Sequence, residues 1–128
     1  MLCNVAAGVF DNAVDPDRTA RFLAAPDHVI VVALAGDLVV GMGTGLVYYH
    51  PDKPPQFWIN EVGTGDAWLR RGIARRVMQA LLDEAQGRGC RYIWLGTEDD
   101  NRPARKLYRA MGGEETAGLV TFEWGQEG

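Results

Sequence analysis

The strongest constraint on the fold is one long amphipathic segment with glycines at both ends. From Gly72 to about Arg88, apolar residues recur at three- and four-residue spacing, which is the period of a helix with one buried face. Gly87 and Gly89 end the run, since glycine readily adopts the left-handed conformation that closes helices. The apolar positions are Ile73, Val77, Ala80, Leu81, Leu82 and Ala85. The sequence therefore predicts a long helix in the second half of the chain.

Shorter helices and strands are predicted around this helix. Residues 28–34 and 38–49, separated by a Gly-Asp turn, form a predicted β-hairpin. Further predicted strands are 56–64, 92–97 (short and buried) and 119–124, and further predicted helices are 4–10 (weak), 15–25 (capped by Asp15 before Pro16) and 103–111. This order predicts a mixed α/β fold, with antiparallel hairpins first and a βαβ unit later.

Two local patterns qualify the predicted sheet. Gly41, Gly43 and Gly45 alternate along one strand, so one face of that strand is open to close approach by another element. The segment 50–55 contains three prolines, which fix φ and remove hydrogen-bond donors. We expect it to be an irregular loop between two strands.

Composition limits the function classes. The chain has 128 residues, 47% of them hydrophobic, and a formal net charge of −4, so we expect a single domain over residues 1–128 with no affinity for nucleic acid or for anionic membranes. It has no long apolar run and no basic leader followed by one, and its two cysteines, Cys3 and Cys90, lack metal-type spacing. We therefore expect a cytoplasmic protein with reduced thiols and no metal.

The start of the long helix has the features of an anion site. Arg70 and Arg71 precede Gly72, Ile73 and Ala74, and unpaired N–H groups at a helix start attract phosphate or pyrophosphate. Arginines and a glycine at this place are also common as ordinary helix capping with a solvated basic face. The loop alone leaves both interpretations open.

Three blocks together resemble the GNAT acetyltransferase superfamily. They are Ile59-Asn60-Glu61-Val62-Gly63 on a strand, Arg70-Arg71-Gly72-Ile73-Ala74 opening a helix, and Asn101 followed by Ala104 and Tyr108. They occur in the family's order and spacing, and the resemblance covers roughly residues 29–124. The segment 50–55 before the first block is similar to the small aminoglycoside 3-N-acetyltransferase-like branch. The resemblance implies a central, mostly antiparallel mixed sheet flanked by helices.

The chain departs from the family pattern in two places. Leu69 stands where the family's phosphate loop usually has Gln or Arg. The family's usual first strand, before the first helix, is apparently missing. Its loss would leave an unpaired edge beside the hairpin, which a partner subunit in a homodimer would cover.

The resemblance implies that acetyl-CoA is the cosubstrate and assigns residues to it. Loop amides hold its pyrophosphate, the end of the strand pairs with its pantetheine arm, and the later block adds contacts. The implied residues are Arg70, Arg71, Gly72, Ile73, Ala74 and Arg75 for the pyrophosphate, Val62, Gly63 and Thr64 for pantetheine, and Asn101 and Ala104 for the further contacts. Asn101 is equally suited to cap the helix that follows it.

The same resemblance implies an acid–base pair. An alkylammonium must lose a proton before it attacks a thioester, and Glu61 is the candidate base; the alternative is a carboxylate paired with a neighbouring arginine. Tyr108 is the candidate acid for the departing thiolate; the alternative is a core tyrosine with a wet hydroxyl. Backbone N–H groups near Val62 and Gly63 are candidate oxyanion donors.

Weaker candidates concern the acceptor, a small-molecule amine. Tyr49 and His50, and the acidic run Glu98, Asp99 and Asp100, are candidate substrate-binding residues; the alternative for each is an exposed loop residue. The leading acceptor is an aminoglycoside, followed by a polyamine, a small metabolite or a protein amine. Two other functions stay open: an acyl-CoA-binding module without turnover, and a plain interaction domain. The four tryptophans are interpreted as core or interface residues.

Overall fold

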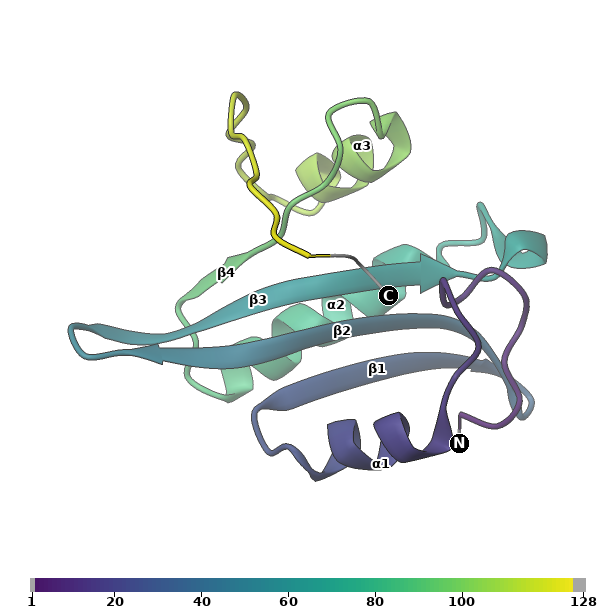
Figure 1. Cartoon of the computed structure of the whole chain (residues 1–128). Helices are drawn as coiled ribbons and strands as arrows, with labels where there is room; N and C mark the ends of the chain where they lie inside the picture. Colours follow the sequence, from purple (N-terminus) through teal and green to yellow (C-terminus); the bar gives the residue numbers. More distant parts are fainter. Residues whose placement is uncertain (1, 126–128) are drawn as a thin grey trace. The chain divides into compact units, whose positions relative to one another are not determined.

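The computed structural model describes residues 2–125, which divide into two compact units, one up to Gly96 and one from Thr97 onward. Figure 1 shows the elements of each unit, coloured along the chain. The two units are described separately below.

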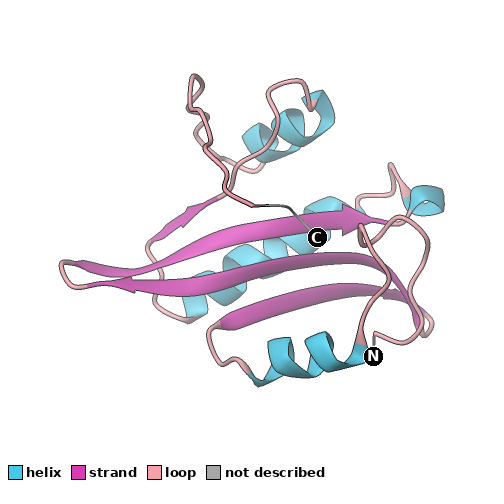
Figure 2. Ribbon diagram, viewed as in Figure 1, coloured by secondary structure: helices cyan, strands magenta, loops and turns pink. Residues whose placement is uncertain are grey.

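The first unit is a four-stranded sheet with two α-helices. Its elements are α1 (Pro16–Ala24), β1 (His28–Ala35), β2 (Leu38–His50), β3 (Lys53–Thr64), the 3₁₀ turn η1 (Asp66–Trp68), α2 (Ile73–Gly87) and β4 (Tyr92–Trp94). The strands lie in the order β1-β2-β3-β4 (Figure 2), antiparallel from β1 to β3 and parallel between β3 and β4. The mixed α/β prediction is confirmed, including the hairpin and the parallel β3–α2–β4 unit.

Helix α1 begins where its sequence predicts. The Asp15 carboxylate accepts a hydrogen bond from the Arg18 N–H at 2.8 Å, and Pro16 occupies the first turn. The side chain satisfies one of the N–H groups that have no partner within the helix, and proline needs no donor there. Together they fix the start of the helix.

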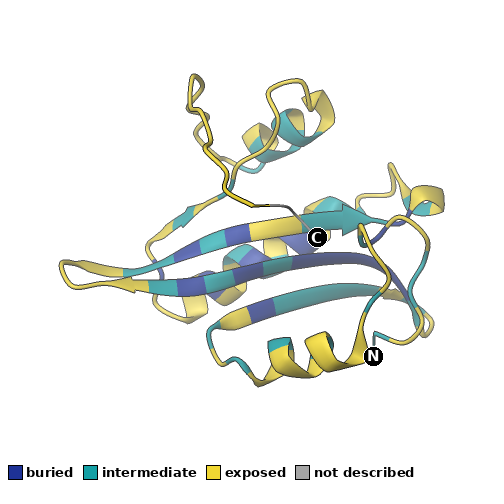
Figure 3. Ribbon diagram, in the orientation of Figure 1, coloured by how far each residue is buried: buried dark blue, intermediate teal, exposed yellow. Residues whose placement is uncertain are grey.

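Helix α2 packs on one face of the sheet, and the glycines of β2 make room for it. The predicted apolar stripe is buried at Val77, Leu81 and Ala85, together with Met78. A Cβ on Gly43 would lie 2.6 Å from a Leu81 methyl and 2.7 Å from a Val77 methyl. The close approach predicted from the alternating glycines is thus confirmed. Figure 3 shows the resulting core on the strands and on α2.

The N-terminal segment is not helical, and the prediction of a weak helix over 4–10 is wrong. Ala6 donates its N–H to the Val39 carbonyl and Val39 donates to the Asn4 carbonyl, both at 2.8 Å. Val5 forms an isolated parallel bridge with Val39, and Val9 joins Val39 and Met42 in a buried cluster. Pairing with β2 and apolar burial outweigh the weak local helix propensity.

Strand β3 begins earlier than predicted, inside the proline-rich segment. The expectation of an irregular loop over 50–55 is wrong beyond Asp52, because β3 starts at Lys53. Pairing of β3 with β4 begins only at Gln56, so Pro54 and Pro55, which have no N–H to donate, lie outside the part of β3 that pairs with β4. Proline is tolerated at such a strand end.

Strand β4 is shorter and more exposed than the predicted buried strand 92–97. It ends at Trp94, and the side chains of Tyr92 and Trp94 are 56% and 41% exposed. Within residues 2–125 it pairs with β3 alone and is an edge of the sheet. Of its apolar side chains, Trp94 stacks on Trp58 of β3 and lies outside the core.

The second unit contains α3 (Arg102–Ala110) and an irregular segment. Asn101 caps α3 by accepting a hydrogen bond from the Ala104 N–H at 3.2 Å, and Met111 ends it, so the predicted helix is confirmed. The strand predicted over 119–124 is wrong: this segment has no regular structure, and its apolar side chains are exposed. High β-propensity does not form a strand without a paired neighbour.

Among residues 2–125, no helix is long and apolar enough to cross a membrane.

Candidate active site

Glu61 projects from the face of the sheet that α2 does not cover. It pairs across the β2–β3 ladder with Thr44, whereas the adjacent Gly43 faces the apolar side chains of α2. Because successive strand residues point to opposite faces, Thr44 and Glu61 share the other face. The carboxylate is on an exposed residue, which suits a group that exchanges protons with a substrate.

An irregularity in β3 sets this orientation. Gly45 pairs with Ile59 and the preceding β2 residue pairs with Glu61, so Asn60 has no partner in the register. This extra residue is a β-bulge, which shifts the alternation of side chains by one position. Trp58 and Glu61, three residues apart, therefore point to the same face.

A cavity of about 250 Å³ lies beside Glu61. Its walls include Arg18, Thr19 and Phe22 of α1 and Ile30 and Thr44 of the sheet. Asp11 and Asp15 also line it, so one guanidinium, two hydroxyls and three carboxylates, that of Glu61 included, surround a space that a small amine can enter. Because the pocket is open, these groups are accessible to a polar ligand.

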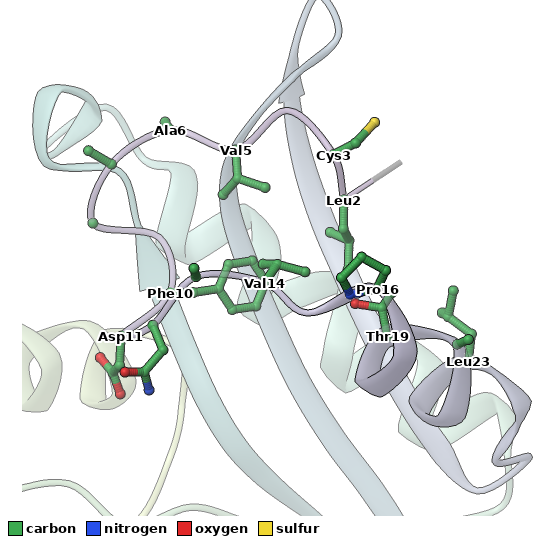
Figure 4. Close-up of a pocket in the computed structure, with 15 residues that line it drawn as sticks. Leu2, Cys3, Val5, Ala6, Phe10, Asp11, Val14, Pro16, Thr19 and Leu23 are labelled. Carbon is green, nitrogen blue, oxygen red and sulfur yellow. The ribbon is translucent and has the colours of Figure 1, made fainter. Parts of the chain in front are cut away.

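A larger hollow, of about 810 Å³, adjoins this cavity and lies between the N-terminal segment and α1. Figure 4 shows that its labelled lining is mainly carbon, with Phe10, Val14 and Leu23 among the apolar side chains and Asp11 and Thr19 among the polar ones. The two spaces share much of their lining, including Phe10, Asp11 and Thr19. A ligand at Glu61 therefore has an apolar surface next to it.

The loop before α2 has the backbone of an anion-binding turn. Arg70 and Gly72 both have positive φ, 63° and 78°, and this left-handed conformation is uncommon for a residue other than glycine. Gly72 caps α2 without a side-chain hydrogen bond. The amides at the helix start are thus available to an external acceptor.

Side chains around this loop add positive charge. The Arg71 guanidinium lies 4.9 Å from the centre of the Trp68 ring, and Arg70, Arg71 and Arg75 are exposed. Stacking on an aromatic face restrains the guanidinium while leaving its N–H groups in solvent. Leu69, which replaces a polar family residue, is 57% exposed.

The outer edge of β3 is open over its second half. Strand β4 pairs with Gln56–Trp58 only, so no described strand adjoins that edge from Ile59 to Thr64. On its other side β3 remains paired with β2 as far as Thr64. Val62, Gly63 and Thr64 therefore lie where an extended ligand can bind along the strand by β-type hydrogen bonds.

In the second unit, Tyr108 lies on α3 with a partly buried side chain. Burial raises the pKa of its phenol, because desolvation disfavours the phenolate. The phenol is therefore protonated at neutral pH, as a proton donor must be. Asn101 and Ala104 make the capping bond that starts this helix.

The acidic run before α3 forms the turn that leads into the helix. The Glu98 carbonyl accepts from the Asn101 N–H at 3.1 Å, and the Asp99 carbonyl accepts from the Arg105 guanidinium at 2.6 Å. Asp100 likewise accepts through its backbone, and all three residues are exposed. These hydrogen bonds stabilise the turn, and the role of the three residues toward a substrate stays a prediction.

The side chains of Tyr49 and His50 make different contacts. The Tyr49 hydroxyl donates to the Asp27 carboxylate at 3.0 Å, and this hydrogen bond is the main cause of the raised pKa of its phenol. His50 instead packs edge-on against Tyr48, at 5.9 Å. Neither lines the cavity beside Glu61.

The family model for the GNAT acetyltransferases matches residues 3–112. The chain belongs to this acetyltransferase family. The match includes the Glu61 strand, the Arg70–Gly72 loop and the Asn101–Tyr108 helix, and so confirms the resemblance stated above. The narrower resemblance to the 3-N branch stays a prediction.

Curated GNAT relatives act on different amines. The chain is 33% identical over 104 residues to the N-alpha-acetyltransferase RimI of Mycobacterium tuberculosis, a match that spans 81% of this chain and 63% of that protein. It is 22% identical over 116 residues to an aminoglycoside N(6')-acetyltransferase of Salmonella typhimurium, spanning 88% of this chain and 74% of the relative.

Solved structures of GNAT proteins share the fold. An aminoglycoside acetyltransferase from an uncultured soil metagenomic sample superposes with a TM-score of 0.80 at 19% identity, covering 91% of this chain and 77% of that one. An aminoglycoside N-acetyltransferase in complex with CoA gives 0.74 at 20% identity, covering 86% and 85%. At these identities the comparison shows the fold.

Several residues of this GNAT site escaped the sequence analysis. Arg18, Thr19 and Thr44 line the cavity with Glu61, but no motif marks them. The interpretation of Trp58 and Trp94 as core residues is wrong, because neither is buried; their interpretation as interface residues stays a prediction. The sequence shows one tryptophan on each of two predicted strands. Only the pairing of those strands shows that the two rings are neighbours. Among residues 2–125 no cluster of three or more metal-binding side chains occurs.

Proposed function

We propose that this GNAT protein transfers the acetyl group of acetyl-CoA to a primary amine of a small molecule. The main supporting observation concerns β3 and the loop that follows it. Strand β3 is open along its outer edge from Ile59 and leads through a positive-φ turn to the start of α2, which no side chain caps by a hydrogen bond. An open strand edge suits the amide groups of pantetheine, and a helix start beside arginines suits the pyrophosphate. Acetyl-CoA carries both features.

Each part of this cosubstrate has residues that suit it. The amides of Ile73, Ala74 and Arg75 are the candidate pyrophosphate donors, with Arg70 and Arg71 at the rim. Leu69 offers no polar contact, so the pyrophosphate depends on the loop amides and on these arginines. A relative of the same fold was solved with CoA bound, which supports this assignment.

The proposed chemistry needs one base and one acid. Glu61 accepts a proton from the ammonium of the acceptor, and the free amine attacks the thioester carbonyl carbon. The C–N bond forms and the C–S bond breaks. The nitrogen releases its second proton to water, the thiolate takes a proton from the Tyr108 phenol, and water returns a proton to the phenolate. The products are the acetylated amine and CoA.

A thiol-release assay tests this function. Purified protein with acetyl-CoA and a panel of aminoglycosides, polyamines and peptides should free CoA only when an acceptor is present. Glu61→Gln and Tyr108→Phe should each lower kcat by roughly 10²-fold. Glu84→Gln, on the exposed surface of α2, is the matched control for loss of one carboxylate. Acceptor-dependent release that both variants retain in full would refute the two assignments.

Binding without turnover would favour the acyl-CoA-binding module instead. Calorimetry with acetyl-CoA separates that outcome from a plain interaction domain, which would not bind the thioester.

A second candidate acceptor is a protein N-terminal amine. It is favoured by the 33% identity to RimI, whose name describes N-alpha acetylation. Peptide arms in the same panel distinguish the two: a kcat/KM for peptides well above that for every small amine would replace the small-molecule acceptor.

A further inference from the structure

Three aromatic side chains form one connected surface on the sheet. The Trp58 and Trp94 rings stack at 5.9 Å with an interplanar angle of 27°. The Trp94 indole N–H donates to the Tyr48 hydroxyl at 2.6 Å. We call Tyr48, Trp58 and Trp94 the aromatic wall. The stacking and the hydrogen bond fix its rings relative to one another.

The aromatic wall lies on the same face of the sheet as Glu61. Thr44 pairs with Glu61, and Leu46, two residues further along β2, pairs with Trp58; Trp58 in turn pairs with Trp94. Alternate residues on a strand share a face and lie about 7 Å apart. The wall therefore begins one row away from the carboxylate, on the side opposite α2.

The wall is open to solvent. Trp94 is 41% exposed, and Trp58 and Tyr48 are partly exposed. On the opposite face, by contrast, Phe57 is covered by other side chains, with 0% exposure. Exposed indole faces attract organic cations, since the ring carries negative potential above its plane.

We propose that the aromatic wall binds a second positive charge of the acceptor, and that the acceptor is a small polycationic amine. This inference rests on the proposed function and specifies its substrate class. One ammonium lies at Glu61 and loses its proton, while another, about 7 Å or more away, lies over the Trp94 or Trp58 ring. The net charge of −4 favours such a ligand over an anionic one.

Paired ligands of equal chain length test the charge. The unaltered protein should bind 1,6-diaminohexane, which is long enough to span the two positions, at least fivefold more tightly than hexylamine, measured by calorimetry with CoA present. Trp94→Ala should remove this difference, lowering affinity for the diamine while that for hexylamine changes less than twofold. Trp124→Ala, which removes an 89% exposed tryptophan of the second unit, is the matched control.

Conservative variants separate binding from folding. Trp94→Phe keeps an aromatic face but loses the hydrogen bond to Tyr48, so it should recover part of the preference for the diamine. Tyr48→Phe should keep most of it. Thermal melts of all variants show whether each is folded, and in the assay Trp94→Ala should raise KM for the diamine with kcat changed less than twofold.

Two classes of polycationic amine, aminoglycosides and linear polyamines, differ in shape. A larger effect of Trp94→Ala on neamine than on 1,6-diaminohexane identifies an aminoglycoside-type acceptor, and the reverse identifies a linear polyamine. Equal losses for hexylamine and the diamine in a folded Trp94→Ala variant, or no loss for either, would overturn the inference. Because calorimetry needs no turnover, it remains informative if thiol release fails with every amine, the result that counts against the proposed function.

Discussion

The Arg71 guanidinium stacks on the Trp68 ring, 4.9 Å from its centre, at the turn that leads into α2. The contact joins a charged side chain of the proposed pyrophosphate site to the preceding 3₁₀ turn. It restrains an exposed arginine that would otherwise sample many rotamers, and so lowers the entropic cost of binding an anion.

Removing this arginine should weaken acetyl-CoA binding. Arg71→Ala is expected to raise the Kd about tenfold, equivalent to ~1.4 kcal/mol, while Arg71→Lys, which keeps the charge but not the planar stack, should fall between. Calorimetry measures both. Arg91→Ala removes another exposed arginine, outside the loop, and should bind normally; a similar loss there would indicate a general charge effect.

A methyl group at Gly43 should destabilise the first unit. Its Cβ would lie 2.6 Å from Leu81 and 2.7 Å from Val77, so Gly43→Ala forces α2 away from the sheet at a cost of about 1–3 kcal/mol. Urea unfolding followed by tryptophan fluorescence measures the change. Gly87→Ala, where a Cβ meets nothing within 4 Å, should be neutral or stabilising. Equal midpoints for the two variants would contradict the packing described here.

The cap at Asn101 should control the stability of α3. Asn101→Ala loses the acceptor for the Ala104 N–H and is expected to cost ~1 kcal/mol of local stability. Hydrogen exchange at the first-turn amides of α3 should accelerate about fivefold. Asn101→Asp keeps a capping oxygen and should exchange like the unaltered protein; if it instead lost acetyl-CoA affinity alone, the amide would have a role beyond capping.

The second unit should lose a contact in acid. Hydrogen bonds from Arg105, then Arg109, lower the pKa of the Glu115 carboxyl to about 2. Since the pKa in the folded chain lies below the value of 4.5 for the free group, the stabilisation is complete above that value and is lost as the pH falls from there toward 2. NMR titration of the carboxyl measures the pKa directly. In Glu115→Gln this pH dependence should disappear, and a titration near 4.5 in the unaltered protein would show that the pairing does not form in solution.

Periodicity and capping chemistry were sufficient to predict most of the first unit. The stripe from Ile73 to Ala85 and the cap at Asp15 act locally, so their helices could be predicted without knowledge of the fold. The glycines of β2 indicated a close neighbour but not which one. For Asn4–Phe10, pairing with Val39 decided the structure, and a partner more than 30 residues away leaves no local pattern.

The candidate site was predictable as residue types but not as an arrangement. Glu61 and the Arg70–Gly72 loop lie in recognisable blocks. The face on which Glu61 projects depends on Asn60 having no partner in the register, and nothing in its side chain signals that. Trp58 and Trp94 resemble core residues until the pairing of β3 with β4 shows that they stack on an open face. The segment 119–124 shows the converse, because its strand-like composition is not matched by a described partner.

The unpaired residue at position 60 divides β3 into two halves, in which side chains alternate between the two faces of the sheet but out of step with one another. Even-numbered residues before it and odd-numbered residues after it share one face, so counting by twos across the strand assigns Glu61 to the wrong side. Substitutions at this position keep the extra residue, whereas deleting it would restore regular alternation, with Ile59 still opposite Gly45 and Glu61 still opposite Thr44. A relative that lacks this residue would therefore keep its carboxylate on the same face, and a gap at this position in an alignment would not by itself be a sign of lost activity.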